Sequence, residues 1–189
     1  MKVYLIRHGR TEADEKHLYC GTTDLSLSEK GIEELRQLKT QIAYPDPEGK
    51  KLITSGKLRC NQTLGILFGN VYYSVDPKLS EMNFGAFEMR TYEELKHDPS
   101  YMAWITGDNE ANIAPGGESG DIMIARVWQA YESVMRFVRQ DTILVVHGGT
   151  IASVMAHLFP YEGKNRYEWQ PSFGRGYCVD PEEKRYTVL

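Results

Sequence analysis

The sequence of 189 residues predicts a single α/β domain, a three-layer sandwich in which helices flank a mostly parallel central sheet. Three observations support this prediction. Val3–Ile6 and Thr142–Val146 are continuous apolar runs, typical of strands covered on both faces. Segments with apolar residues at helical spacing separate these runs along the chain. The sequence contains no solenoid-length repeat and no low-complexity tract.

The first half of the chain alternates between the two kinds of element. In order, we expect a strand at Val3–Ile6, a helix from Ser28 to the turn at Pro45–Pro47, a weaker strand at Leu52–Thr54 and a helix at Leu58–Phe68. Ser28 is a good N-cap, and Leu27 and Ile32 occupy the positions of a hydrophobic staple. The first helix then presents one apolar stripe, made by Ile32, Leu35, Leu38 and Ile42.

The second half begins with a looser pattern between about residues 76 and 120. We read this region as an excursion over the sheet edge, with one or two short helices within Tyr92–Ile105 around Pro99 and loops at Gly107–Glu110 and Pro115–Gly117. Regular elements then return: a helix from near Glu118 or Ser119 to Val138, the strand Thr142–Val146, a helix at Gly149–Leu158, and a terminal hairpin with strands at Tyr177–Val179 and Arg185–Leu189.

Composition excludes several kinds of partner. The 22 lysines and arginines against 26 acidic residues give a formal charge of −4, which argues against nucleic acid or an anionic membrane. Three scattered cysteines without a CxxC pair suggest neither a disulfide framework nor a zinc site. The start MKVYLIRHG does not resemble a signal peptide, and no apolar run approaches the roughly 20 residues that span a bilayer. We therefore expect a cytoplasmic protein.

Two histidines directly follow the buried strands. His8 and His147 each stand after a strand and before a glycine, and the carboxyl ends of parallel strands are where such sheets bind ligands. Ser55 follows the third strand, and Arg59 comes one helical turn later. Two imidazoles, together with the guanidinium groups of Arg7 and Arg59, are therefore expected to converge.

This combination suits a phosphoryl group. Arginine binds phosphate through a planar fork that keeps its charge, and a helix beginning at Gly149 directs free N–H groups toward an anion. An imidazole beside arginine stays neutral and nucleophilic near pH 7. Either RHG or HGG alone is more often a structural turn, so the prediction depends on their occurring together with Arg59.

Six ordered blocks then give the chain a family resemblance. They are Leu5–Glu12, Asp24–Gly31, Thr54–Thr63, Leu79–Glu88, Pro115–Ser119 and Val145–Gly149. As a set they resemble the histidine phosphatase superfamily, the phosphoglycerate mutase-like proteins, in its short phosphatase branch with α-ribazole phosphatases and broad-specificity phosphatases. The resemblance implies one domain over residues 1–189, with a lid or insertion at about residues 76–120.

The resemblance also implies roles for individual residues. His8 would be the nucleophile, and Glu81 would protonate the leaving oxygen and then activate water. Arg7, Arg59 and His147 would surround the phosphate. Further contacts with the substrate would come from Thr11, Asp14, Gly21, Thr22 and Gly148. No metal and no cofactor is implied.

Two positions depart from the family pattern. Asp14 stands where the family has a phosphate-binding asparagine, so we expect it to be protonated, to pair with a neighbour such as Arg10, or to weaken phosphate binding. Gly56 replaces a proline, which should loosen that turn only. Glu88 is expected to be structural, Glu118 to lie in the first turn of a helix, and Cys60 to be a small buried residue.

The expected activity is metal-independent hydrolysis of a small phosphorylated metabolite through a phosphohistidine. Three alternatives stay open: a cofactor-dependent phosphoglycerate mutase, a non-catalytic phosphate-binding or regulatory module, and a metal hydrolase using His8, His147 and Glu81. Specificity should reside in Tyr92–Gly120 and around Lys164–Arg166, where Tyr101 and Trp104 form either an aromatic lid or part of the core. We expect a monomer or a homodimer.

Overall fold

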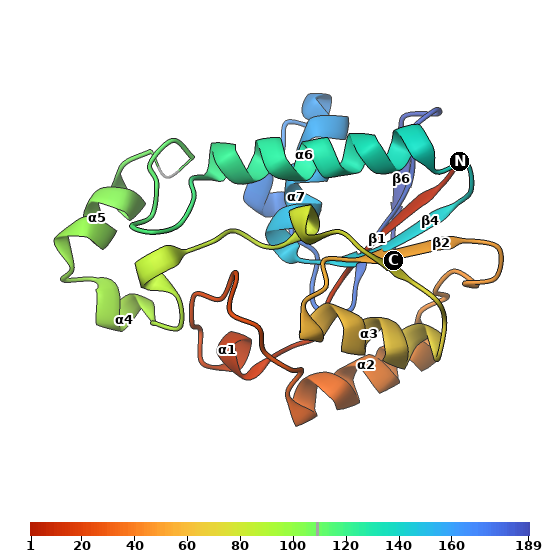
Figure 1. Ribbon diagram of the computed structural model, residues 1–189, viewed down its shortest axis with the longest axis horizontal. Coiled ribbons are helices and arrows are strands. Elements are labelled where there is room, and N and C mark those ends of the chain that lie inside the picture. Colours follow the sequence, from red (N-terminus) through yellow and green to blue (C-terminus); the bar gives the residue numbers. More distant parts are fainter. Residues whose placement is uncertain (109) are drawn as a thin grey trace.

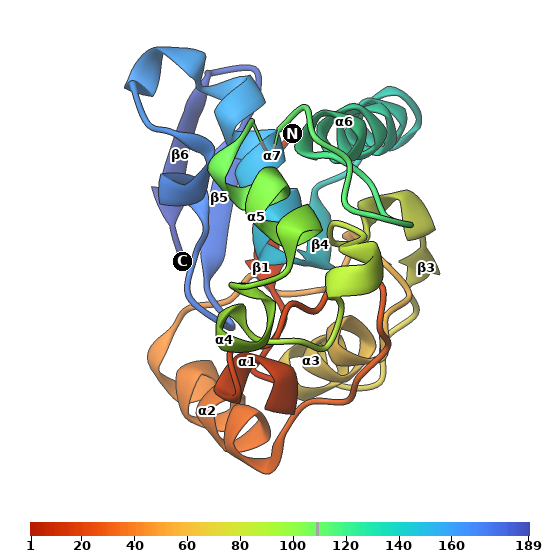
Figure 2. The same cartoon turned by 90° about the vertical axis from the view of Figure 1, so that its left-hand side faces the viewer.

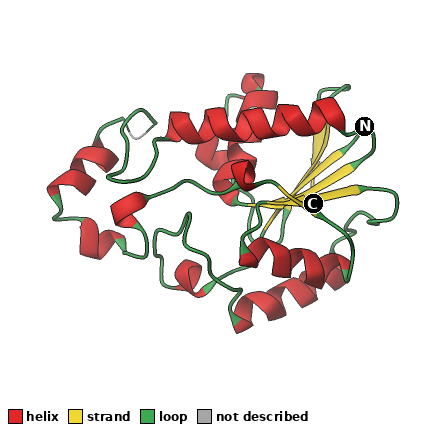
Figure 3. Cartoon of the chain, in the orientation of Figure 1, coloured by secondary structure: helices red, strands yellow, loops and turns green. Residues whose placement is uncertain are grey.

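The computed structural model describes residues 1–108 and 110–189, so Asn109 of the expected Gly107–Glu110 loop lies outside the described residues. Within these residues, six strands form one mixed sheet between two layers of helices (Figures 1 and 3). The strand order is β3-β2-β4-β1-β5-β6. The strands are β1 (Val3–Arg7), β2 (Lys51–Thr54), β3 (Ser74–Val75), β4 (Thr142–Val146), β5 (Gly176–Asp180) and β6 (Arg185–Val188).

The parallel part of the sheet is the part that the apolar runs predict. β1 and β2 both pair in parallel with β4, with Arg7 opposite Val146 and Thr54 opposite Val145. All five residues of β4 are buried, which explains why its sequence does not alternate. β5 and β6 add the expected terminal hairpin, antiparallel to β1 and to each other. The expected fold class is confirmed.

Two pairs of helices cover the two faces of the sheet (Figure 1). Leu144 and Val146 of β4 belong to the apolar cluster under α6 and α7, whereas Ile143 and Val145 belong to the cluster under α2 and α3.

Among the described residues, no helix has the length and apolarity that a membrane crossing needs. The helices are α1 (Glu12–Glu15), α2 (Glu29–Gln41), α3 (Leu58–Phe68), α4 (Tyr92–Leu95), α5 (Pro99–Thr106), α6 (Gly120–Phe137) and α7 (Gly148–Leu158).

The helix ends follow from capping residues. The Ser28 hydroxyl caps α2 by accepting from Gly31 N at 3.0 Å, and the Ser119 hydroxyl caps α6 by accepting from Ile122 N at 3.3 Å. Pro99 is the first residue of α5, where its missing N–H costs nothing. α7 begins at Gly148, one residue earlier than expected, with His147 in the N-cap position.

The segment between η1 (Pro77–Leu79) and α6 extends beyond the carboxyl edge of the sheet, with α4 and α5 at its far end (Figures 1 and 2). Tyr101 and Trp104 of α5 are buried in one cluster with Phe87, and the Tyr101 hydroxyl lies 2.6 Å from that of Tyr19. Of the two alternatives for these aromatic residues, the core is correct. The described residues also form 3-10 turns at Gly85–Phe87, Pro160–Glu162 and Arg166–Trp169.

The start of α2 lies against the backbone that follows His8, and this close packing is testable. A Cβ atom at Gly31 would lie 2.1 Å from the carbonyl oxygen of Arg10, so Gly31→Ala should lower the free energy of unfolding by about 1–3 kcal/mol. Gly65 of α3 has nothing within 4 Å of such an atom, so Gly65→Ala should raise it by about 0.5–1 kcal/mol. Urea denaturation measures both, and equal effects of the two substitutions would contradict the packing.

Candidate active site

The parallel register of β1 and β4 brings the two predicted histidines together. His8 follows β1 and His147 follows β4, and their ring centroids are 5.1 Å apart. A hydrogen bond of 2.9 Å from His8 N to the carbonyl of Val146 extends the ladder to the site itself. Both side chains are buried, with 6% of His8 and none of His147 exposed.

One ring nitrogen of His8 is left free. Nδ1 lies 2.7 Å from the carbonyl oxygen of Gly9, and because a carbonyl only accepts, Nδ1 carries the hydrogen. Nε2 therefore holds a lone pair. Burial, with the charges of Arg59 and Arg7, lowers the pKa of His8 well below 6.5. The imidazole is neutral at pH 7, as a nucleophile requires.

Arg59 joins the site to a loop that faces it. Its guanidinium is buried and donates to the carbonyls of Thr23 at 2.8 Å and Gly21 at 2.7 Å. The Glu88 carboxylate holds the same loop from its other side, accepting from the amides of Gly21, Thr22 and Thr23 at 2.8–3.0 Å. Although burial acts to raise the pKa of Glu88, hydrogen bonds from the Thr23 hydroxyl and from the amides of Thr22, Thr23 and Phe84 lower it overall. Glu88 has the structural role expected of it.

His147 uses both ring nitrogens within the protein. Its Nδ1 accepts from Arg59 Nε at 3.3 Å, so its Nε2 carries the hydrogen and donates to the Ser55 hydroxyl at 2.8 Å. Burial, Arg59 and His8 lower the pKa of His147 well below 6.5. The Ser55 hydroxyl also lies 3.4 Å from the sulfur of Cys60, which is buried as expected, and burial raises the pKa of that thiol to about 12.

Arg7 presents an unused donor. Its Nη1 donates to the carbonyl of Pro171 at 2.8 Å, and its guanidinium carbon lies 3.9 Å from the centre of the Phe173 ring. Its Nε is buried and has no hydrogen-bond partner among the described residues. Burial lowers the pKa of Arg7, and the charges of Glu81 and Asp14 act to raise it. A buried, unpaired guanidinium N–H beside two neutral imidazoles can donate to an anion.

Glu81 reaches the site from the stretch between η1 and the 3-10 turn Gly85–Phe87, within the expected lid region. Its Oε2 accepts from Gly149 N at 2.8 Å at the start of α7, and a Cβ atom at Gly149 would lie only 2.3 Å from Oε1. The glycine is therefore required for this close approach. Glu118 supports the same segment: it pairs with Arg126 at 2.5 Å and accepts from Asn83 N at 2.9 Å. Glu118 precedes the N-cap of α6, so its expected place in the first turn was wrong.

Asp14 and Thr11 bind each other. The Asp14 carboxylate accepts from the Thr11 amide at 2.8 Å and from its hydroxyl at 2.7 Å, forming the cap of α1. Arg10, suggested as the partner of Asp14, instead pairs with Glu34 at 3.2 Å. Asp14 pairs with Thr11 because residues three apart meet at a helix start, whereas Arg10 extends toward α2.

The remaining predicted residues border this centre. Gly21 and Thr22 lie in the loop held by Arg59 and Glu88, with Thr22 exposed. A Cβ atom at Gly148 would lie 3.0 Å from the guanidinium carbon of Arg7. Sequence reasoning missed Phe173, whose ring centroid is 6.0 Å from that of His8, because it lies outside the six motif blocks. Among the described residues, no three His, Cys, Asp or Glu side chains are grouped as metal ligands.

Comparison with known proteins identifies the family. The model of the histidine phosphatase superfamily, branch 1, matches residues 3–189. The chain belongs to this superfamily. It is 28% identical to the adenosylcobalamin/alpha-ribazole phosphatase of Salmonella typhimurium over 185 residues, which cover 95% of this chain and 90% of the relative.

Similar solved structures include both a phosphatase and a mutase. The alpha-ribazole phosphatase of Shigella flexneri has a TM-score of 0.83 at 25% identity, covering 100% of this chain and 95% of that one. A phosphoglycerate mutase of Thermus thermophilus has a TM-score of 0.71 at 27% identity, covering 95% and 93%. The protein is thus a superfamily enzyme with the phosphoglycerate mutase-like fold.

The buried neutral histidines predict how stability depends on pH. In the unfolded chain they titrate near pH ~6.5, whereas the pKa values of folded His8 and His147 lie well below it. Below about pH 6.5 the unfolded chain binds more protons than the folded chain does. The free energy of unfolding should therefore decrease as the pH is lowered, by up to about 2.7 kcal/mol per pH unit. Urea denaturation from pH 8 to pH 5 measures this slope. The double variant His8→Asn/His147→Asn should lose it, and an unchanged slope would contradict the assignment.

Proposed function

We propose that the protein is a phosphomonoesterase that hydrolyses a small phosphorylated metabolite through a phosphohistidine at His8. The observation on which this rests is the neutral His8 imidazole beside the guanidinium of Arg7. Its Nδ1 donates a hydrogen bond to the carbonyl oxygen of Gly9, which leaves the lone pair of Nε2 free. Such a ring attacks phosphorus without first losing a proton, and the arginine stabilises charge on the phosphate oxygens.

In the first step, Nε2 of His8 forms a bond to phosphorus while the ester P–O bond breaks. The Glu81 carboxyl gives its proton to the leaving oxygen, which departs as an alcohol. In the second step, Glu81 takes a proton from water, the resulting hydroxide attacks phosphorus, and the P–N bond breaks. The products are inorganic phosphate and neutral His8, and Glu81 is again protonated.

His147 and Arg59 are proposed to bind the phosphate oxygens together. Their mutual contact of 3.3 Å is long for a hydrogen bond, and we expect phosphate to replace it. His147 then needs its hydrogen on Nδ1, and the hydroxyl of Ser55 permits this exchange because it can donate to Nε2 as well as accept from it.

Hydrolysis is favoured over phosphoryl transfer by the higher structural similarity to a phosphatase. The alpha-ribazole phosphatase of Shigella flexneri has a TM-score of 0.83, against 0.71 for the mutase of Thermus thermophilus. The mutase of Thermus thermophilus supports the second candidate. An assay with 3-phosphoglycerate and a catalytic amount of 2,3-bisphosphoglycerate distinguishes the two activities. A phosphatase releases inorganic phosphate, whereas a mutase yields 2-phosphoglycerate.

The role of Glu81 is tested by changing the leaving group. Glu81→Gln should lower kcat/KM for an alkyl phosphate by about 10²–10⁴-fold, because an alkoxide needs the proton. With p-nitrophenyl phosphate the first step should survive, giving one burst of p-nitrophenolate per enzyme and an accumulated phosphohistidine. Stopped-flow absorbance and acid-labile ³²P measure these.

Two controls accompany this experiment. His8→Ala should abolish both the burst and the labelling, and EDTA should leave wild-type turnover unchanged. Turnover that survives in His8→Ala would exclude the phosphohistidine, loss of activity in EDTA would favour a metal hydrolase, and no turnover of any phosphoester would favour a binding module.

Replacing Asp14 by the asparagine of the family pattern should raise the affinity of the site for phosphate. An asparagine can accept both hydrogen bonds from Thr11 through Oδ1, while its amide replaces an anionic oxygen with a donor. Asp14→Asn should therefore lower the inhibition constant of inorganic phosphate by about three- to tenfold, since it removes a charge that repels phosphate. Glu12→Gln removes an equal charge from an exposed position of α1 and serves as the control. Equal inhibition constants for Asp14→Asn and wild type would show that Asp14 does not affect phosphate binding.

A further inference from the structure

A groove of about 510 Å³ opens between α2 and the loop of residues 170–175 that leads into β5. We propose that it binds a second anionic group of the substrate, so that the preferred substrates are phosphomonoesters that also carry a carboxylate or a second phosphate. This inference rests on the proposed function, because it assumes that the phosphoryl group lies at His8.

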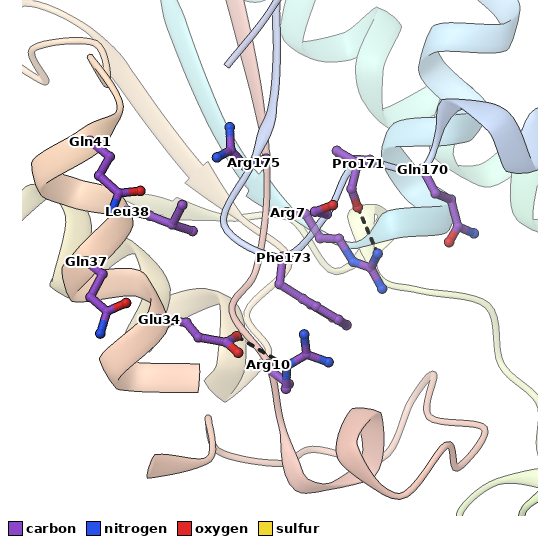
Figure 4. Close-up of a pocket in the computed structure, with 11 residues that line it drawn as sticks. Arg7, Arg10, Glu34, Gln37, Leu38, Gln41, Gln170, Pro171, Phe173 and Arg175 are labelled. Carbon is purple, nitrogen blue, oxygen red and sulfur yellow. Dashed lines mark hydrogen bonds and ion pairs between the residues drawn. The ribbon is translucent and has the colours of Figure 1, made fainter. Parts of the chain in front are cut away.

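The charge of the groove favours an anion. Three guanidinium groups line it, those of Arg7, Arg10 and Arg175, against the single carboxylate of Glu34. Figure 4 shows Arg10 beside Glu34 at one end, and Arg175 extending toward α2 at the other. In a protein of formal charge −4, this is a local concentration of positive charge.

The guanidinium groups of Arg10 and Arg175 have N–H donors that make no hydrogen bond within the described residues. Arg10 uses only Nε for Glu34, at 3.2 Å, so its two terminal amino groups make no hydrogen bond within the described residues. The half-buried Arg175 side chain likewise has neither an ion pair nor a hydrogen bond there. Free guanidinium forks that face a cavity match the oxygen pairs of carboxylate and phosphate.

The groove begins beside the candidate active site. Arg7 belongs to both, and the Phe173 ring lies between it and Arg10, with guanidinium carbons 3.9 Å and 4.6 Å from the ring centre (Figure 4). The ring centroid is 6.0 Å from that of His8. Phe173 therefore fixes both arginines by cation–π contact at the junction of the two sites.

The leaving group can enter the groove from the side of the proposed proton donor. At the start of α7, one glycine lies against the candidate active site and the other lies against residues of the groove. A Cβ atom at Gly149 would lie 2.3 Å from the Glu81 carboxylate, and one at Gly148 would lie 3.0 Å from the Arg7 guanidinium and 3.3 Å from the Gln170 amide oxygen. Because Gln170 lines the groove, two adjacent residues of α7 contact the proposed proton donor on one side and the groove lining on the other.

The test compares ligands that differ only in the second anionic group. Calorimetry with 4-phosphonobenzoate and phenylphosphonate needs no turnover, and wild type should bind the carboxylate compound at least tenfold more tightly. Arg10→Gln and Arg175→Gln should each reduce that ratio by about three- to tenfold, and raising the salt from 20 to 500 mM should also reduce it. Arg36→Gln, an equal charge change at an exposed position of α2, should leave the ratio unchanged.

Catalysis gives the second readout. The ratio of kcat/KM for 3-phosphoglycerate to that for glycerol 3-phosphate should fall in Arg10→Gln and Arg175→Gln, mainly through KM, and should stay constant in Arg36→Gln. If wild type turns over none of these esters but binds 4-phosphonobenzoate selectively, the proposed hydrolysis fails and the groove stands as an anion site.

Three results would overturn the proposal for the groove. The first is equal binding of the two phosphonates by wild type, and the second is an unchanged binding ratio in both arginine variants. The third is saturable binding of free benzoate that does not compete with 4-phosphonobenzoate, which would place the carboxylate site outside the reach of a bound substrate.

Discussion

The parallel pairing of β1 with β4 is the constraint on which the rest of the site depends. It sets Arg7 opposite Val146, so the next residue of each strand is a histidine at the same edge of the sheet. β2 pairs with the other side of β4 and delivers Ser55, from which α3 brings Arg59 back toward the two rings. Strand pairing, with the first turn of α3, therefore assembles residues from three distant parts of the chain.

Burial then decides the chemistry of the assembled groups. Two imidazoles removed from water beside arginines keep their lone pairs, because a second positive charge there would have no solvent to stabilise it. Arg59 is charged and buried, but it is satisfied by two backbone carbonyls and by His147. A protein of formal charge −4 thus contains a small, preorganised cationic pocket.

The sequence predicts the sheet, the long helices and the convergence of His8, His147 and Arg59 well, because each depends on local signals. Apolar runs mark strands buried on both faces, and Ser28 and Ser119 mark helix starts. Partners that depend on tertiary packing were not predictable in this way. Nothing near Arg10 indicates that Glu34 is its partner, and the place of Phe173 between two arginines appears only once β5 is paired with β1.

The loop held by Glu88 has a consequence for how this protein can evolve. The amides of Gly21, Thr22 and Thr23 all donate to the Glu88 carboxylate, and two of the carbonyls there accept from Arg59. The main chain of these three residues therefore has no amide left to offer a ligand, unlike loops that cradle phosphate with backbone N–H groups. Recognition by these residues must come from side chains, so single substitutions can change ligand preference while the path of the backbone, and with it the fold, stays the same.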